Sequence, residues 1–118
     1  MAPKPTKISL KKIAKTLEIT FEDGQIYILP AELLRVESPS AEVQGHSEGQ
    51  KKIIFGRREV NILKVEPVGN YAIRIFFDDL HDTGIFSWKY LYTLGNEKKT
   101  RWNSYLKILK EKGLSRDP

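Results

Sequence analysis

The strongest constraint on the fold is a hairpin pattern near the start of this 118-residue chain. Residues 17–21 alternate apolar and polar side chains, Asp23-Gly24 follows, and residues 25–29 alternate again with Ile26 and Ile28 in phase. Glycine accepts the positive φ of a two-residue turn. The pattern therefore predicts two antiparallel strands joined at Asp23-Gly24.

The rest of the chain predicts further strands first and helices last. A second hairpin is expected over residues 61–77, and Pro67 is expected at an edge or a bulge because proline cannot donate to a ladder. Short helices are expected over 31–35 and 88–94, the second ended by Gly95, and a last helix is expected after Asn96 as its cap. The predicted class is α+β: a small antiparallel sheet built from hairpins, a short helix after the first hairpin, and two carboxy-terminal helices.

Length and composition favour one domain. We expect a flexible basic leader over residues 1–7 and a single domain over 8–118. The chain has no cysteine, which excludes disulfides, thiolate zinc sites and cysteine-ligated iron–sulfur clusters. No apolar run is long enough to cross a membrane and no secretory pattern is visible, so a cytoplasmic protein without a membrane partner is expected.

The net charge of +5 is concentrated at the two ends of the chain. Residues 1–15 contain five lysines and no acid, residues 89–118 carry a net +5, and residues 16–88 carry a net −5. Basic ends can bind an anion or RNA, which is one alternative function. No phosphate-cradling loop or RNA-binding aromatic signature accompanies the charge, so nucleic acid is not the expected partner.

The two histidines supply a second alternative. His46, Glu48 and His81 match the His-x-carboxylate…His pattern of mononuclear iron sites, which would make the chain a metal-binding component of an oxidoreductase. His-x-Glu arises readily by chance in a glutamate-rich chain, and we favour hydrogen bonding of both histidines within their loops. No hydrolase elbow, P-loop, dinucleotide fingerprint or zinc-protease motif occurs, so no catalysis is expected.

Four stretches have no periodic explanation. They are LRVESPSAEVQGH (34–46), VEPVGNYAIR (65–74), FDDLHDTGIFSWKYL (77–91) and GLSRDP (113–118). Together they make the chain resemble stand-alone bacterial members of the gamma-butyrobetaine hydroxylase-like N-terminal domain family, long classed as a domain of unknown function. The resemblance runs from residue 8 to the end.

The resemblance implies a degenerate metal site. In the eukaryotic carnitine-biosynthesis dioxygenases this module precedes a separate catalytic domain and binds zinc through three cysteines and a histidine. The cysteine positions correspond to Ser38, Ser40 and Val43, and the histidine to His81. Because hydroxyls are poor zinc ligands and valine is none, we expect neither zinc nor iron, nor any other cofactor.

In place of the metal we predict a polar pocket. Ser38, Ser40 and His81 are expected to hydrogen-bond with one another, and Arg35 to pair with Glu37 or Asp79. The complete set of candidate binding residues is Arg35, Ser38, Ser40, His46, Asp79 and His81.

Relatives of this module are fused to Mrp-type P-loop ATPases that carry iron–sulfur clusters. The resemblance therefore implies a non-catalytic binding or adaptor module with a protein partner, such as an Mrp-type ATPase, accessory to iron–sulfur cluster handling.

Overall fold

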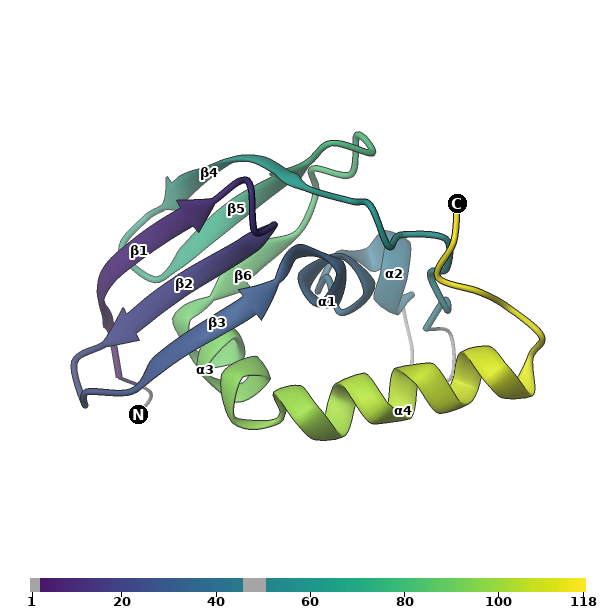
Figure 1. Ribbon diagram of the computed structural model, residues 1–118. Helices are drawn as coiled ribbons and strands as arrows, with labels where there is room; N and C mark the ends of the chain where they lie inside the picture. Colours follow the sequence, from purple (N-terminus) through teal and green to yellow (C-terminus); the bar gives the residue numbers. More distant parts are fainter. Residues whose placement is uncertain (1–2, 46–50) are drawn as a thin grey trace.

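The computed structural model describes residues 3–45 and 51–118, which form two three-stranded antiparallel sheets and four helices (Figure 1). The first sheet has the order β1 (Pro5–Lys11), β2 (Thr16–Phe21), β3 (Ile26–Pro30). The second has the order β4 (Ile62–Val68), β5 (Ala72–Phe77), β6 (Ile85–Ser87). The helices are α1 (Ala31–Val36), α2 (Ala41–Gln44), α3 (Trp88–Asn96) and α4 (Lys98–Glu111). The α+β class is confirmed, with the strands divided between two sheets.

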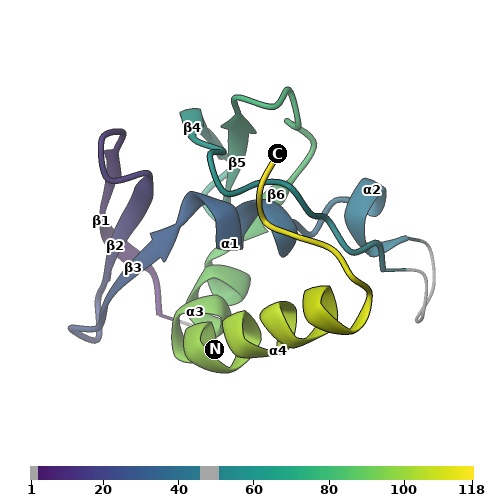
Figure 2. The ribbon, with the colours of Figure 1, turned by 45° about the vertical axis from the view of Figure 1, so that its right-hand side comes forward.

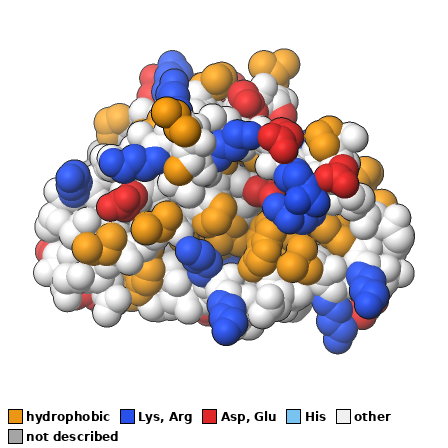
Figure 3. All heavy atoms as spheres, viewed as in Figure 1, with side chains coloured by type: hydrophobic (Ala, Val, Ile, Leu, Met, Phe, Trp, Pro, Cys, Tyr) orange, Lys and Arg blue, Asp and Glu red, His pale blue; other side chains and the backbone are white. Residues whose placement is uncertain are grey.

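The sheets share one core, to which α1 and α3 contribute buried residues. Figure 2 shows the two sheets and the helices from a second direction. Alternation places every second residue of β2 and β5 in this core. The buried core residues on these two strands are Leu17, Ile19, Phe21, Ile73, Ile75 and Phe77. Charged side chains of both signs lie among hydrophobic ones on the face in Figure 3.

The first hairpin has a longer loop than predicted. Phe21 N donates to Gln25 O (2.8 Å) and Gly24 N to Phe21 O (3.0 Å), so Glu22–Gly24 form a three-residue loop, with Gly24 at φ +89°. The extra residue shifts the phase of β3 by one position. Ile26 and Ile28, expected on the buried face, are therefore exposed, and Leu29 is buried instead.

Strand β1 begins earlier than predicted. Residues 5–7, assigned to the flexible leader, belong to β1, which pairs with β2 from Pro5 onward. Thr6 and Lys7 are both polar and exposed, so no apolar alternation marks this end of the strand in the sequence. Pro67 lies in β4, an edge strand, as expected.

The carboxy-terminal helices follow the prediction except at their junction. Ser87 caps α3 by accepting a hydrogen bond from Tyr90 N (3.0 Å), as predicted. Gly95 does not end α3; it lies inside the helix against the ring of Tyr27, and a Cβ there would approach the ring within 2.3 Å. Asn96 accepts a hydrogen bond from the Tyr27 hydroxyl rather than capping α4.

The segment expected to be a loop over residues 37–50 contains the short helix α2. Ser40 caps it by accepting from Glu42 N (3.2 Å). Within the described ranges, no helix has the length and hydropathy needed to cross a membrane.

Candidate functional site

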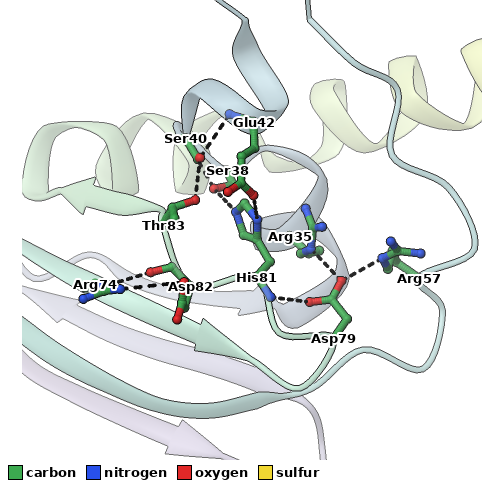
Figure 4. Close-up of polar contacts among 10 residues, drawn as sticks. All are labelled: Arg35, Ser38, Ser40, Glu42, Arg57, Arg74, Asp79, His81, Asp82 and Thr83. Atoms are coloured by element: carbon green, nitrogen blue, oxygen red, sulfur yellow. Dashed lines mark hydrogen bonds and ion pairs between the residues drawn. The ribbon is translucent and has the colours of Figure 1, made fainter.

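A cluster of polar side chains lies where the α1–α2 segment meets the loop between β5 and β6 (Figure 4). The Ser38 Oγ lies 2.9 Å from His81 Nε2, and His81 Nδ1 lies 3.0 Å from Glu42 Oε2. Ser38 is fully buried, and His81 is 5% exposed. The three side chains form a linear hydrogen-bonded chain from the interior to the surface, where Glu42 is 62% exposed.

The protonation of this chain follows from its surroundings. Burial lowers the pKa of His81, and the positive charge of Arg35 lowers it further, outweighing the opposite effect of Glu42. His81 is therefore neutral at pH 7. Because the Glu42 carboxylate only accepts, His81 Nδ1 carries the proton and donates to it. His81 Nε2 then accepts a hydrogen bond from the Ser38 hydroxyl.

A second group of charges lies behind His81. Arg35 Nε and Arg57 Nε each donate to Asp79 Oδ2 at 2.7 Å, and Asp79 Oδ1 accepts from His81 N (3.2 Å). Burial opposes ionisation of Asp79, but the hydrogen bond and charge of Arg35 prevail and hold the pKa of Asp79 below its ordinary value. Within residues 3–45 and 51–118, Arg35 Nη1 is the buried side-chain polar atom without a partner.

The structure brings together part of the predicted set. Ser38 contacts His81, and Arg35 pairs with Asp79 rather than Glu37, which binds Lys51 and Arg101 instead. The Ser40 hydroxyl does not reach His81; it bonds Thr83 Oγ1 at 2.6 Å. His46 and Glu48 lie outside the described residues.

Three members of the cluster were missed from the sequence: Glu42, Arg57 and Thr83. Glu42 had a signal, since it follows the capping Ser40 in the first turn of α2. Thr83 lies in the 77–91 stretch two residues after His81, which was its signal; Arg57 had none, because only the tertiary fold brings it to the cluster.

The order Ser–His–carboxylate matches the connectivity of a hydrolase triad. Geometry rules out that use. The Ser38 hydroxyl is packed against Gly84, where an added Cβ would approach Ser38 Oγ within 2.4 Å, and Ser38 has no exposed surface. No acyl group can reach this oxygen. The arrangement instead satisfies buried polar groups that would otherwise be costly.

The residues present do not fit zinc. Both ring nitrogens of His81 are engaged by Ser38 and Glu42, and Val43, at a position the resemblance assigns to a ligand, has no donor. In the part of the chain that the structure describes, no three His, Asp or Glu side chains converge as metal ligands do.

Known proteins resemble this chain along most of its length. The family model described as gamma-butyrobetaine hydroxylase-like, N-terminal, matches residues 8–92. No curated protein matches this chain.

Solved structures match it too. One protein solved by NMR in solution is 46% identical over 100% of this chain and 93% of its own, with a TM-score of 0.87. Another protein solved by NMR in solution is 47% identical over 98% of this chain and 86% of its own, with a TM-score of 0.84. A protein of unknown function in the DUF971 family from Acidithiobacillus ferrooxidans, solved by crystallography, is 37% identical over 78% of this chain and 92% of its own, with a TM-score of 0.67.

Proposed function

The chain belongs to the gamma-butyrobetaine hydroxylase-like N-terminal domain family, classed among domains of unknown function, and from this premise we propose that it is a non-catalytic adaptor module for a protein partner. The observation that carries the proposal is the hydrogen-bonded chain of Ser38, His81 and Glu42. Ser38 and His81 are buried, and both ring nitrogens of His81 are engaged by hydrogen-bond partners. They stabilise the fold and leave its surface for binding.

The same cluster argues against the oxidoreductase alternative. An iron ion bound by His46, Glu48 and His81 would need a free ring nitrogen on His81. Coordination at Nε2 would break the hydrogen bond with Ser38, and coordination at Nδ1 would break the one with Glu42. Coordination at Nε2 deprives the buried Ser38 hydroxyl of its acceptor, which costs about 1–3 kcal/mol, and coordination at Nδ1 gives up the charged partner Glu42.

Ion pairing argues against binding of RNA through the carboxy-terminal basic residues. Arg116 makes a bidentate pair with Glu32 at 2.7 and 2.8 Å, and Arg101 pairs with Glu37 and Glu97. These guanidinium groups are already neutralised inside the fold. Their contribution to an external anion site is correspondingly small.

The partner that we propose is an Mrp-type P-loop ATPase, and the process is iron–sulfur cluster handling in the cytoplasm. The support is the fusion of similar modules to such ATPases, because domains joined in one chain commonly work in contact. The chain has no cysteine to hold a cluster itself, so its contribution would be docking.

Calorimetric titration of the purified chain with the Mrp-type ATPase of the same organism tests the proposal. We expect saturable one-to-one binding, and no stoichiometric metal by elemental analysis of either the wild type or the chain reconstituted with iron. Stoichiometric iron that is lost in His81→Ala, together with no binding of the ATPase, would favour the oxidoreductase instead. Ile28→Ser, a change at an exposed residue of β3 outside the polar cluster, is the control for non-specific loss of binding.

A further inference from the structure

Two loops carry the most exposed large apolar side chains of the described residues. Ile13, in the β1–β2 turn, is fully exposed, and Leu80, in the β5–β6 loop, is 85% exposed. A single exposed apolar residue needs no explanation. Two exposed apolar residues on loops that are joined by hydrogen bonds do need an explanation.

Asn61 fastens the two loops. Its Nδ2 donates to Lys12 O (2.9 Å), its backbone N donates to Asp78 Oδ1 (3.0 Å), and its carbonyl accepts from Asp78 N (2.9 Å). Lys15, in the same turn as Ile13, pairs with the Glu59 carboxylate at 2.8 Å, which ties this turn to the segment that carries Asn61. The loops are therefore held in a fixed relation before any partner arrives, which lowers the entropic cost of binding.

The backbone at Leu80 is strained. Leu80 has φ +73°, a left-handed conformation that costs an L residue with a side chain about 1–2 kcal/mol. The equivalent position of the β2–β3 turn is Gly24, which adopts φ +89° without that cost. No packing of the Leu80 side chain inside the fold offsets this cost, because the side chain is exposed to solvent. An apolar side chain kept exposed on a strained backbone indicates use outside the chain.

The charge beside Ile13 is positive. Lys11 and Lys12 are exposed, and no carboxylate of residues 3–45 or 51–118 forms an ion pair with either. They belong to the first fifteen residues, which contain five lysines and no acid. The Ile13 side of the two loops therefore complements an acidic surface, and Asp78, on the Leu80 side, accepts a hydrogen bond from Asn61 N.

We propose that these two loops form a docking surface for an acidic protein, hereafter the two-loop surface, made of Lys11, Lys12, Ile13, Asp78 and Leu80. Ile13 and Leu80 enter apolar depressions on the partner, and Lys11 and Lys12 meet carboxylates around them. The inference deepens the proposed adaptor function and rests on it, since it says where the partner binds and what its surface is like.

Site-specific photo-crosslinking in the native host tests the inference. Benzoylphenylalanine is placed at position 13, at position 80, and at two exposed apolar positions elsewhere, Ile28 on β3 and Leu106 on α4. We expect positions 13 and 80 to capture the same protein, identified by mass spectrometry as acidic, and the other two positions to capture none.

The possible outcomes separate the two proposals. Capture from positions 28 or 106 alone would overturn the two-loop surface and leave the adaptor function standing. Capture from no position would contradict both. Linkage to a second copy of the chain, or to phospholipid, would replace the acidic protein by that occupant and so overturn the inference.

Affinity measurements with the captured protein complete the test. Leu80→Gly and Ile13→Ser should each weaken binding about tenfold or more, as expected for interface anchors, whereas Ile28→Ser should leave it unchanged. Leu80→Gly removes the strain together with the side chain, so its loss of binding should come without loss of thermal stability. Unchanged affinity in both anchor variants would refute the inference.

Discussion

Two loops of this molecule have the same backbone design and different surroundings. In Phe21–Gln25, Phe21 N donates to Gln25 O, Gly24 N to Phe21 O, and Gln25 N to Asp23 Oδ1. In 77–81, Phe77 N donates to His81 O (3.0 Å), Leu80 N to Phe77 O (3.2 Å), and His81 N to Asp79 Oδ1 (3.2 Å). Each loop has a positive φ at its fourth residue.

The surroundings separate their roles. Asp23 is at the surface, where a hydrogen bond from the Tyr92 hydroxyl lowers the pKa of its carboxyl. Asp79 is part-buried between Arg35 and Arg57. The first loop needs only to reverse the chain, and Gly24 suits it. The second holds the buried polar cluster and displays Leu80, so one backbone design serves folding in one place and binding in the other.

The largest expected difference between the loops is in the unfolding free energy lost when the equivalent aspartates, Asp79 and Asp23, are replaced. Asp79→Ala leaves the Arg35 guanidinium, whose side chain is 9% exposed, without its counter-charge. Breaking a buried ion pair on one side costs about 3 kcal/mol. Asp23→Ala removes a surface contact and should cost far less. Urea unfolding of the two variants measures the difference, and equal losses would show that burial does not distinguish the loops.

The second expected difference is in pH dependence, through the histidine that ends the second loop. The pKa of His81 is lowered from its ordinary 6.5, so the unfolded chain binds more protons in acid than the folded one does. The stability contributed by neutral His81 is complete above about pH 6.5 and falls as the pH drops toward the folded-state pKa. The slope is at most about 1.4 kcal/mol per pH unit.

Unfolding free energies measured between pH 7.5 and 5 in His81→Gln provide the comparison, because Gln cannot titrate. The slope should be shallower in this variant, and NMR titration of the His81 ring in the wild type should give a pKa below 6.5. A His81 ring that titrates above that value would contradict the neutral histidine of the polar cluster. Asp79 adds a dependence only below its ordinary 3.8, outside this window.

The smallest expected effect comes from exchanging the left-handed residues. Gly24→Ala meets no atom within 4 Å, so its cost is that of the backbone alone, about 1 kcal/mol. Leu80→Gly relieves a similar strain but loosens the unfolded chain, and should gain about 0.5 kcal/mol. Thermal unfolding of both variants measures the pair. A stabilising Gly24→Ala or a destabilising Leu80→Gly would mean that the two backbones are not equivalent.

The sequence predicted the strands well and the loop lengths poorly. Alternation is a local property, so both hairpins were found near their observed positions. The length of the first loop depends on which residues form its closing hydrogen bond. Phe21 N donates to Gln25 O, which gives three loop residues instead of the predicted two and places Ile26 and Ile28 on the opposite face of the sheet. Glycine is common at helix ends, which is why Gly95 was predicted to end the helix. In the structure its lack of a side chain instead allows close contact with Tyr27.

The candidate site was found in part, and through the family resemblance. Ser38 and His81 were named and do meet. Their further partners are distant in the sequence: Arg57, which lies outside the four stretches that carry the resemblance, is 22 residues from Asp79, and Glu42 is 39 residues from His81. Pairing over such separations is decided by how sheets and helices pack.

By itself, the sequence determined the strand and helix periodicities, the lack of any thiol donor, and the basic character of the first fifteen residues, because each is a property of the side chains or of their immediate neighbours. Only the tertiary structure decided that His81 is neutral, that Asp79 joins two arginines, and that Asn61 holds the loops of Ile13 and Leu80 together. Desolvation and long-range hydrogen bonding depend on which distant segments meet, and the pattern within any one segment does not specify that.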